Sequence, residues 1–277
     1  MQSATANYAG ALQPFYWDNY RDTAVGRYLF QHEYAFAERF LHAEGEPRRL
    51  LDVCCGSGRM SLPLRATGLN VVGVDINPVA LAAFRQRSDE IPLVMASGLS
   101  LPFADASFDC VIAMQCFEYL EHRRFLFELN RVLRNGGLLV FDALNRHSYK
   151  LVKAYVGRAL DLPSANLSCR EILSATAGSG FNIQAVSGYN WIPFTRESNS
   201  GLVRLADQVE RKLRLGRYYS ISPKILVAAT KKCAIQPFWS SCTRPVRVSA
   251  AHRASSPGLT LPTPSRQSPT NESPDKE

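Results

Sequence analysis

Short apolar runs alternate with amphipathic segments through most of the chain, and this pattern predicts strands that alternate with helices. The apolar runs have the length of strands and are rich in Val, Ile, Leu and Phe. Residues between most of them place apolar side chains at helical spacing. The predicted strands cover residues 49–54, 70–75, 91–96, 108–115, 138–142, 181–189 and 225–230.

Several predicted helices begin or end at residues with known capping preferences. Asn77 is expected to cap a helix that starts at Pro78. Asn135, Gly136 and Gly137 are expected to stop the helix that precedes them. The predicted helices cover one or two segments within 16–41, then 59–66, 78–87, 123–133, 148–160, 169–177 and a segment with an apolar stripe within 202–213.

The order of these elements predicts an α/β fold, because parallel neighbouring strands need crossover connections. We expect a doubly wound, mostly parallel, Rossmann-like sheet of seven strands with helices on both faces. The expected domain is residues 16–232, with a helical cap (16–46), a cofactor-binding core (48–147) and substrate-side helices and last strands (148–232). Residues 1–15 are expected to form a flexible arm.

Composition changes the picture at the carboxyl end of the chain. Residues 233–277 contain seven of the sixteen prolines, among many Ser and Thr. Such a segment buries too little apolar surface to offset the entropy lost on ordering, so we expect a disordered tail. The formal charge of +8 is dispersed between this tail and residues 204–217. We interpret the basic segment as a solvated surface in preference to an anionic-membrane contact, and without an RNA-binding pattern the chain disfavours nucleic acid as a partner.

The sequence also bears on the compartment. No apolar run is long enough to cross a bilayer, and the first residues lack the pattern of a secretory signal. The seven cysteines show neither metal-ligand spacing nor a paired framework, which is typical of free thiols in a reducing compartment. We therefore predict a cytoplasmic protein without a bound metal.

Candidate chemistry lies where the first two predicted strands end. Gly56 and Gly58 form a turn that lets the backbone approach a ligand. Asp75 ends the second strand and can accept hydrogen bonds from two ribose hydroxyls, although a helix-capping role is the alternative. Asp52 lies inside the first strand, so we expect it to face the crevice and bind turn amides or a ligand ammonium. Ser61 occupies the place of the third glycine in dinucleotide sites, which favours a cofactor without pyrophosphate.

Four segments together resemble a known family. They read LLDVCCGSGRMSLPL, VVGVDINPVAL, LSLPFADASFDCVIAMQCFEYL and ELNRVLRNGGLLVFDALNR. In order and spacing they resemble the class I S-adenosylmethionine-dependent methyltransferases, of the kind grouped as methyltransferase types 11 and 25. The resemblance covers about residues 48–147, and FDALNRHSYK is more weakly similar to O-methyltransferases of the ubiquinone-biosynthesis type. It implies S-adenosyl-L-methionine as cofactor.

The resemblance also implies roles for particular residues. It places Asp75 on the ribose and Ile76 on the adenine. Cys54 departs from the family pattern by replacing the first glycine of the turn, and Ser97 by replacing the aspartate at the adenine edge. The residues implied to bind the cofactor are Asp52, Cys54, Gly56, Gly58, Asp75, Ile76, Ser97, Gly98, Gln115 and Cys116.

Catalytic candidates follow the strands that face the crevice. A methyltransferase mainly aligns the nucleophile with the methyl group, and a hydroxyl acceptor benefits from a general base. Glu118 and His122 lie four residues apart, so we expect them to share a helical face and to serve this role. An ordinary surface pair at a helix start is the alternative. His147 and Tyr149 are further candidates.

The favoured hypothesis is methyl transfer from S-adenosylmethionine to a small molecule, with a hydroxyl oxygen as acceptor. An NAD-dependent oxidoreductase would share the glycine turn and Asp75, but Ser61 disfavours it. A cofactor-binding protein without transfer activity is a third hypothesis, which Cys54 and Ser97 motivate.

Overall fold

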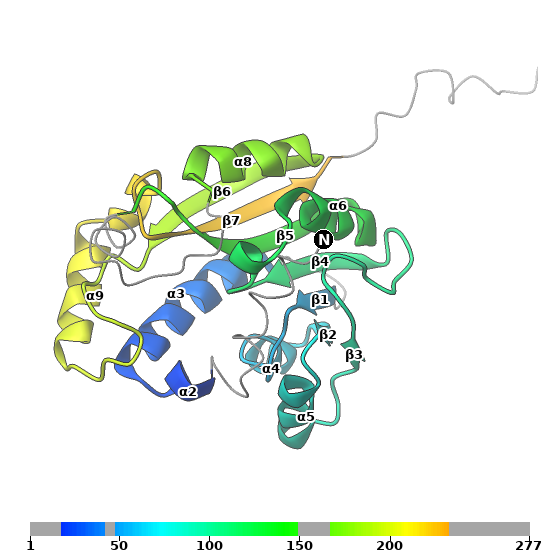
Figure 1. Cartoon of the computed structure of the whole chain (residues 1–277), viewed down its shortest axis with the longest axis horizontal. Helices are drawn as coiled ribbons and strands as arrows, with labels where there is room; N and C mark the ends of the chain where they lie inside the picture. Colours follow the sequence, from blue (N-terminus) through cyan, green and yellow to red (C-terminus); the bar gives the residue numbers. More distant parts are fainter. Residues whose placement is uncertain (1–17, 42–47, 149–166, 233–277) are drawn as a thin grey trace, which may run out of the picture. The chain divides into compact units, whose positions relative to one another are not determined.

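A seven-stranded sheet forms the centre of the described chain, with the strand order β3-β2-β1-β4-β5-β7-β6 (Figure 1). Strands β1 to β5 run parallel to one another, whereas β7 is antiparallel to both β5 and β6. This confirms the predicted mostly parallel, doubly wound sheet. The strands are β1 (Arg49–Val53), β2 (Asn70–Asp75), β3 (Leu93–Met95), β4 (Phe108–Ala113), β5 (Leu133–Leu144), β6 (Phe181–Tyr189) and β7 (Lys224–Lys231).

The computed structural model describes residues 18–41, 48–148 and 167–232, which fall within the first of two compact units, Met1–Ala234. The predicted flexible arm and disordered tail lie outside the described residues, as does all but the first residue of the predicted helix 148–160.

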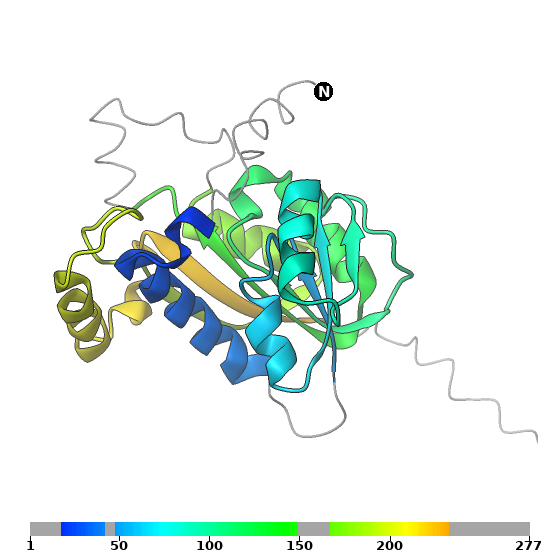
Figure 2. The same ribbon diagram turned by 90° about the horizontal axis from the view of Figure 1, so that it is seen from below.

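Helices cover both faces of the sheet (Figures 1 and 2). Apolar residues of α6 and α8 pack into one buried cluster, and those of α3, α4, α5 and α9 pack into the other. Adjacent strand residues alternate between the clusters: Leu51 faces the first and Leu50 the second. The helical segments are α2 (Asp18–Arg21), α3 (Ala24–Leu41), α4 (Ser61–Ala66), α5 (Pro78–Arg87), η1 (Phe117–Tyr119), α6 (His122–Val132), α8 (Cys169–Gly178), α9 (Leu202–Lys212) and η2 (Leu215–Tyr218). No helix in these ranges is long and apolar enough to cross a membrane.

Two predicted boundaries differ from the structure for physical reasons. The helix expected to stop at Asn135-Gly136-Gly137 ends at Val132, because Leu133 is already extended and pairs with Phe108. The helix expected at residue 59 begins at Ser61, because the glycine turn continues for two more residues. Asn77 caps α5 as predicted, since its side chain accepts hydrogen bonds from two amides of the first turn.

The topology brings the ends of distant strands to one edge of the sheet. The parallel strands β1, β2, β4 and β5 all have their carboxyl ends there. Leu144 at the end of β5 pairs with Lys224 at the start of β7, and Lys224 pairs with Tyr189 at the end of β6. Ligands of doubly wound sheets bind beyond this edge.

Candidate active site

The turn between β1 and α4 is built from residues with positive φ. Cys54 has φ of 60°, Gly56 of 55° and Gly58 of 89°. A Cβ at Gly56 would meet no atom within 4 Å, so this part of the turn borders open space. A Cβ at Gly58 would lie 2.6 Å from the ring of Phe84. Gly58 therefore permits close packing of the turn on α5, in addition to the backbone conformation that the sequence predicted.

Asp75 ties this turn to the end of β2. The Gly56 amide donates to Asp75 Oδ2 and the Asn77 amide donates to Oδ1, each at 2.8 Å. Burial raises the pKa of Asp75, while the two amides act in the opposite direction. Since Asn77 is the cap of α5, the alternative role of Asp75 as a helix cap is wrong. The Ile76 amide adds a third hydrogen bond, and a carboxylate with about four acceptor positions still retains capacity for a ligand hydroxyl.

Asp52 is buried beneath the turn, and Ser61 is its partner. The Ser61 hydroxyl donates to Asp52 Oδ2 at 2.5 Å. Burial raises the pKa of Asp52 to about 7, against the effects of the Ser61 hydrogen bond and the Arg59 cation. The sequence predicted turn amides or a ligand ammonium as the partners of this carboxylate. In the structure, its partners are the hydroxyl and the backbone amide of Ser61, the residue found where dinucleotide sites have a glycine, and the ligand ammonium stays a prediction.

The residues implied to flank the adenine lie on the loops after β2 and β3. Ile76 is exposed. The Ser97 hydroxyl accepts a hydrogen bond from the Leu99 amide at 3.2 Å, so it shapes its own turn. A Cβ at Gly98 would lie 3.0 Å from the Phe125 ring. Gly98 thus has a packing role, while the ligand contacts of Ile76, Ser97 and Gly98 stay predictions.

Cys54 and Cys116 meet beside the glycine turn. Hydrogen bonding to the Cys54 thiol, together with burial, raises the pKa of Cys116 well above its ordinary value. Cys116 Sγ lies 4.0 Å from the Val53 carbonyl oxygen, which places it against the end of β1. The thiol that replaces the expected first glycine is therefore accommodated by a second thiol from the end of β4.

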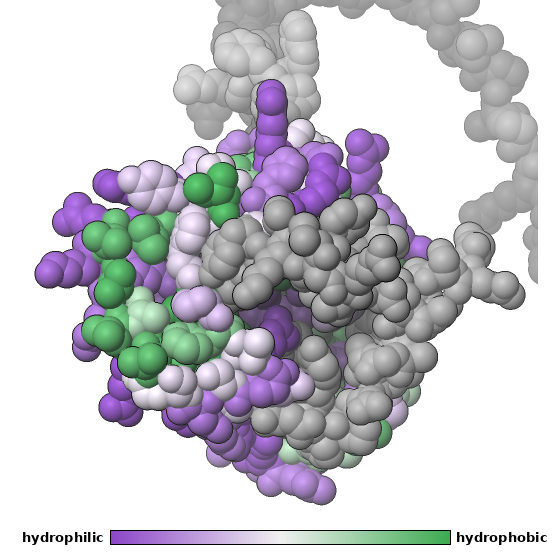
Figure 3. Space-filling view, turned by 60° about the vertical axis from the view of Figure 1, so that its left-hand side comes forward, coloured by the Kyte–Doolittle hydropathy of each residue, from purple (hydrophilic) through white to green (hydrophobic). Residues whose placement is uncertain are grey.

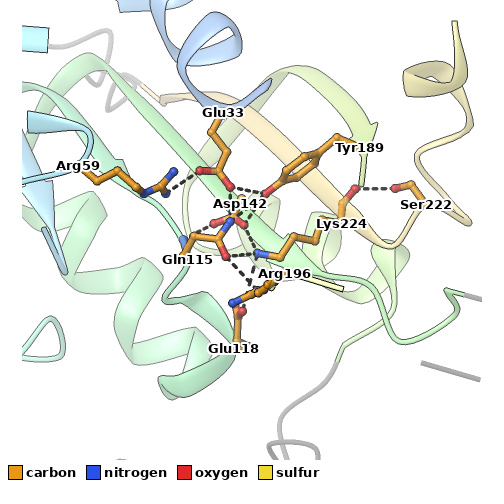
Figure 4. Close-up of polar contacts among 9 residues, drawn as sticks. All are labelled: Glu33, Arg59, Gln115, Glu118, Asp142, Tyr189, Arg196, Ser222 and Lys224. Atoms are coloured by element: carbon orange, nitrogen blue, oxygen red, sulfur yellow. Dashed lines mark hydrogen bonds and ion pairs between the residues drawn. The ribbon is translucent and has the colours of Figure 1, made fainter. Parts of the chain in front are cut away.

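A network of buried charged and polar side chains occupies the same edge of the sheet (Figure 4). Lys224 Nζ donates to Asp142 Oδ2 and to Gln115 Oε1, each at 2.6 Å. The Tyr189 hydroxyl lies 2.7 Å from Asp142 Oδ2 and 2.9 Å from Glu33 Oε1. These contacts join α3, β5, β6 and β7 to Gln115, which lies two residues after the end of β4.

The formal charges of this network balance. Its acidic members are Glu33, Glu118 and Asp142, and its basic members are Arg59, Arg196 and Lys224 (Figure 4). Arg59 pairs with Glu33 at 2.6 Å, and because it belongs to the turn, it links the turn to the network. Burial opposes ionisation of Asp142, but the Lys224 ammonium and the Gln115 amide lower its pKa below the ordinary value. Asp142 is therefore ionised, and Lys224 compensates its charge.

Glu118 differs from the other acids because its carboxylate is not hydrogen-bonded. Glu118 is only 3% exposed, and neither carboxylate oxygen has a hydrogen-bond partner among the described residues. Lys224 Nζ lies 3.9 Å from Oε1. Burial raises the pKa of Glu118, and the Asp142 charge adds to this effect while Lys224 opposes it. Such a carboxylate can accept a hydrogen bond or a proton from a bound acceptor.

Comparison with known proteins shows what this fold and this turn are similar to. The model of the methyltransferase domain of type 11 matches residues 51–141, which run from β1 into β5. These residues therefore match a methyltransferase domain, and the sheet that contains them has the fold of S-adenosylmethionine-dependent methyltransferases. A solved S-adenosylmethionine-dependent methyltransferase from Thermotoga maritima has the same fold, with a TM-score of 0.58 at 17% identity over 83% of this chain and 98% of that one.

Two curated relatives match part of this chain. Demethylmenaquinone methyltransferase of Thermus thermophilus is 40% identical over 107 residues, which are 36% of this chain and 49% of the relative. Malonyl-[acyl-carrier protein] O-methyltransferase of Legionella pneumophila is 34% identical over 119 residues, 41% of this chain and 42% of the relative. The chain thus spans about half or less of the length of these relatives.

The catalytic candidates do not form the predicted arrangement. Glu118 lies in η1, whereas His122 is the first residue of α6, and Leu120 between them is extended. The prediction of a shared helical face is therefore wrong. The His122 ring packs on Phe117 with centroids 4.5 Å apart, and burial lowers its pKa. His147 is exposed, and Tyr149 lies outside the described residues.

Sequence reasoning missed most of the buried network. Asp142 and Lys224 border or interrupt apolar strands, a signal that resembles the one used for Asp52. Glu33 and Tyr189 carry no comparable signal, because their partners lie on other elements. Arg59 and Gln115 also line a cavity of about 20 Å³ beneath the turn before α3. A cavity of this size holds about one water molecule.

Proposed function

We propose that this protein transfers the methyl group of S-adenosylmethionine to a small-molecule acceptor, and that the acceptor atom is a hydroxyl oxygen. The observation that carries the proposal is that two features lie at the same edge of the sheet: the glycine turn tethered by Asp75, and the carboxylate of Glu118, which accepts no hydrogen bond from the described residues. Both curated relatives are also named as methyltransferases, one of a demethylmenaquinone and one of a malonyl group on an acyl-carrier protein.

The turn and its neighbours supply the groups that a cofactor with an adenosine and an amino acid needs. Asp75 retains acceptor capacity for a ribose hydroxyl, and the open side of Gly56 admits a ligand beside the backbone. Asp52 carries a carboxyl whose ionisation a nearby ammonium would favour. Bound S-adenosylmethionine supplies an electrophilic methyl group at this position.

Glu118 is the proposed proton acceptor for the hydroxyl. Its raised pKa brings the carboxylate closer to the pH at which a general base works best. Lys224 and Arg196 hold cationic charge beside it, so an acceptor oxygen that becomes negatively charged is stabilised there. The enclosed position excludes water, which strengthens each of these interactions.

Binding of S-adenosylhomocysteine, measured by calorimetry, tests the cofactor assignment. The wild type should bind, and Asp75→Ala should bind about tenfold or more weakly, because a hydrogen bond to a charged group contributes roughly 1.5–3 kcal/mol. Binding of NADH without binding of S-adenosylhomocysteine would contradict the proposal.

Incubation with S-adenosylmethionine and a metabolite extract, followed by mass spectrometry, tests the transfer. A product heavier by one CH₂ group, whose new methyl is lost on ether cleavage but not on ester hydrolysis, is the expected result. Transfer to nitrogen or carbon would contradict the hydroxyl assignment, and cofactor binding with no product would support a protein without transfer activity.

The role of Glu118 has its own test. Glu118→Gln keeps the shape of the side chain but removes the base, so kcat should fall by about 100-fold or more while cofactor affinity is unchanged. His122→Ala is the matched control on α6 and should retain most of the activity. Full activity of Glu118→Gln would show that no proton passes to this residue.

A further inference from the structure

The side of helix α9 that faces the protein carries both of its acidic residues together with Val203 and Ala206. Glu210 and Val203 are buried, and Glu210 accepts a hydrogen bond from the Tyr28 hydroxyl of α3. Asp207 lies 2.8 Å from His32 of the same helix. Both acidic residues of α9 are therefore used in its attachment to α3.

The apolar stripe of α9 is exposed. Leu202 is 60% exposed, Leu205 57%, Val209 46% and Leu213 54%. These residues recur at helical spacing and form one stripe, which we call the α9 stripe. Exposed Tyr218 and Ile221 follow in the next turns. Figure 3 shows apolar residues gathered in a patch with hydrophilic residues around it. An apolar stripe normally faces the core, so its exposure indicates an interaction surface.

The charges that this region presents to solvent are positive. Asp207 and Glu210 are the only acidic residues between Leu202 and Ile221, and both are engaged as described above. The basic residues of the same stretch are all exposed: Arg204, Arg211, Lys212, Arg214 and Arg217. Arg211 pairs with Asp207, which leaves an excess of cations around the stripe.

The stripe belongs to a segment that also reaches the candidate active site. The chain leaves the sheet at Tyr189, a member of the buried network, and passes through Arg196 before it enters α9. Arg196 donates to Gln115 Oε1 at 3.3 Å. Thr23, in the turn between α2 and α3, donates to the Arg196 carbonyl oxygen at 2.7 Å. The segment is therefore hydrogen-bonded both to Gln115 and to the α2–α3 turn.

We propose that the α9 stripe, with the cations of α9 and η2, docks on an anionic membrane surface. Aliphatic side chains that enter the headgroup region and cations that attract anionic lipids are the two components of interfacial binding. A second copy of the chain would bring the same cations together, so repulsion disfavours that occupant. The sequence alone favoured an ordinary solvated surface for this basic segment, and the exposed stripe is the observation on which we base membrane docking instead. The inference goes beyond the proposed function and does not depend on it.

Co-sedimentation of the full chain with lipid vesicles tests the proposal. The wild type should bind vesicles of phosphatidylcholine that contain phosphatidylglycerol, bind pure phosphatidylcholine vesicles weakly, and dissociate as salt is raised. Lys212→Glu/Arg217→Glu should lower the partition coefficient at least tenfold, since each cation near an anionic surface contributes about fivefold.

A matched pair of variants separates the stripe from general hydrophobicity. Leu205→Gln/Val209→Gln should abolish vesicle binding without lowering Tm. Phe127→Gln, which changes a 65% exposed residue on α6, should bind as the wild type does.

Three results would overturn the inference. The first is absence of vesicle binding by the wild type, and the second is equal binding by both glutamine variants. The third is a lipid-free dimer, detected by ultracentrifugation, that Leu205→Gln/Val209→Gln dissociates. A lower Tm for that variant, together with no vesicle binding by the wild type, would show that the chain itself covers the stripe.

Discussion

Asp52 shows at the residue scale how a buried carboxyl connects stability to ligand binding. Its folded-state pKa of about 7 is raised above the unfolded value by burial. The stability that this group contributes is therefore fully present below its unfolded pKa and is lost as pH rises through about 7. A ligand ammonium beside the carboxylate would offset this loss, since it favours the ionised form.

Affinity for S-adenosylhomocysteine should consequently fall as pH drops below about 7, by up to tenfold per pH unit, because ligand binding then requires loss of a proton. Asp52→Asn should remove this dependence and weaken binding, while it stabilises the ligand-free protein at pH 8 by about 2 kcal/mol. Calorimetry between pH 6 and 8 measures the first effect and urea unfolding the second. A pH-independent wild-type affinity would show that Asp52 does not respond to the ligand.

Cys54 is a second residue whose position is unusual, because a side chain rarely adopts a φ of 60°. Cys54→Ala keeps a Cβ in this conformation, whereas Cys54→Gly removes it. In urea unfolding, the Gly variant should be as stable as the Ala variant or more stable by up to about 1 kcal/mol, even though glycine gains more entropy on unfolding. An Ala variant clearly more stable than the Gly variant would contradict the left-handed backbone at this residue.

At the scale of elements, the ion pair of Asp142 and Lys224 connects β5 to the antiparallel strand β7. The contact is buried, with Lys224 Nζ 2.6 Å from Asp142 Oδ2. Removing one partner of such a pair leaves a charge without compensation, which typically costs about 3–5 kcal/mol. Loss of one partner is therefore expected to change the free energy of unfolding by more than the intact pair contributes to it.

Lys224→Met should therefore lower the free energy of unfolding at pH 7 by about 3–5 kcal/mol. The lowered pKa of Asp142 means that its stabilising contribution is present above the unfolded pKa and is lost as pH falls through the folded value. The difference between wild type and variant should accordingly shrink in acid. Lys232→Met, which changes an exposed lysine just beyond the other end of β7, is the control and should change stability by at most about 0.5 kcal/mol. If the loss of unfolding free energy in Lys224→Met did not depend on pH, its cause would be lost packing and not the uncompensated charge of Asp142.

At the scale of the whole molecule, cofactor binding should stabilise the folded domain through mass action. Ligand at 100 times its Kd adds about 2.7 kcal/mol, which raises Tm by several degrees. Deletion of residues 233–277, which we predict to be disordered, should change neither Tm nor the ligand-induced shift in Tm. Thermal unfolding with and without S-adenosylhomocysteine measures both. A lower Tm after the deletion would show that the tail packs on the domain.

The sequence by itself determined the features that depend on neighbours along the chain. Alternating apolar runs located all seven strands, and the glycine turn and the Asn77 cap are local signals that the structure bears out. The family resemblance was equally readable, because motif order and spacing are properties of the chain.

Tertiary structure alone decided the features that depend on partners far away in sequence. A carboxylate within an apolar strand indicates that a partner is needed, but the topology of the sheet determines which residue that partner is. The partner of Asp142 is Lys224, which lies 82 residues away in the sequence. Likewise, the spacing of apolar residues predicts that α9 is amphipathic, but it does not predict which side of the helix is buried. Tyr28 and His32 bind the acidic side of α9, and for that reason its apolar stripe faces solvent.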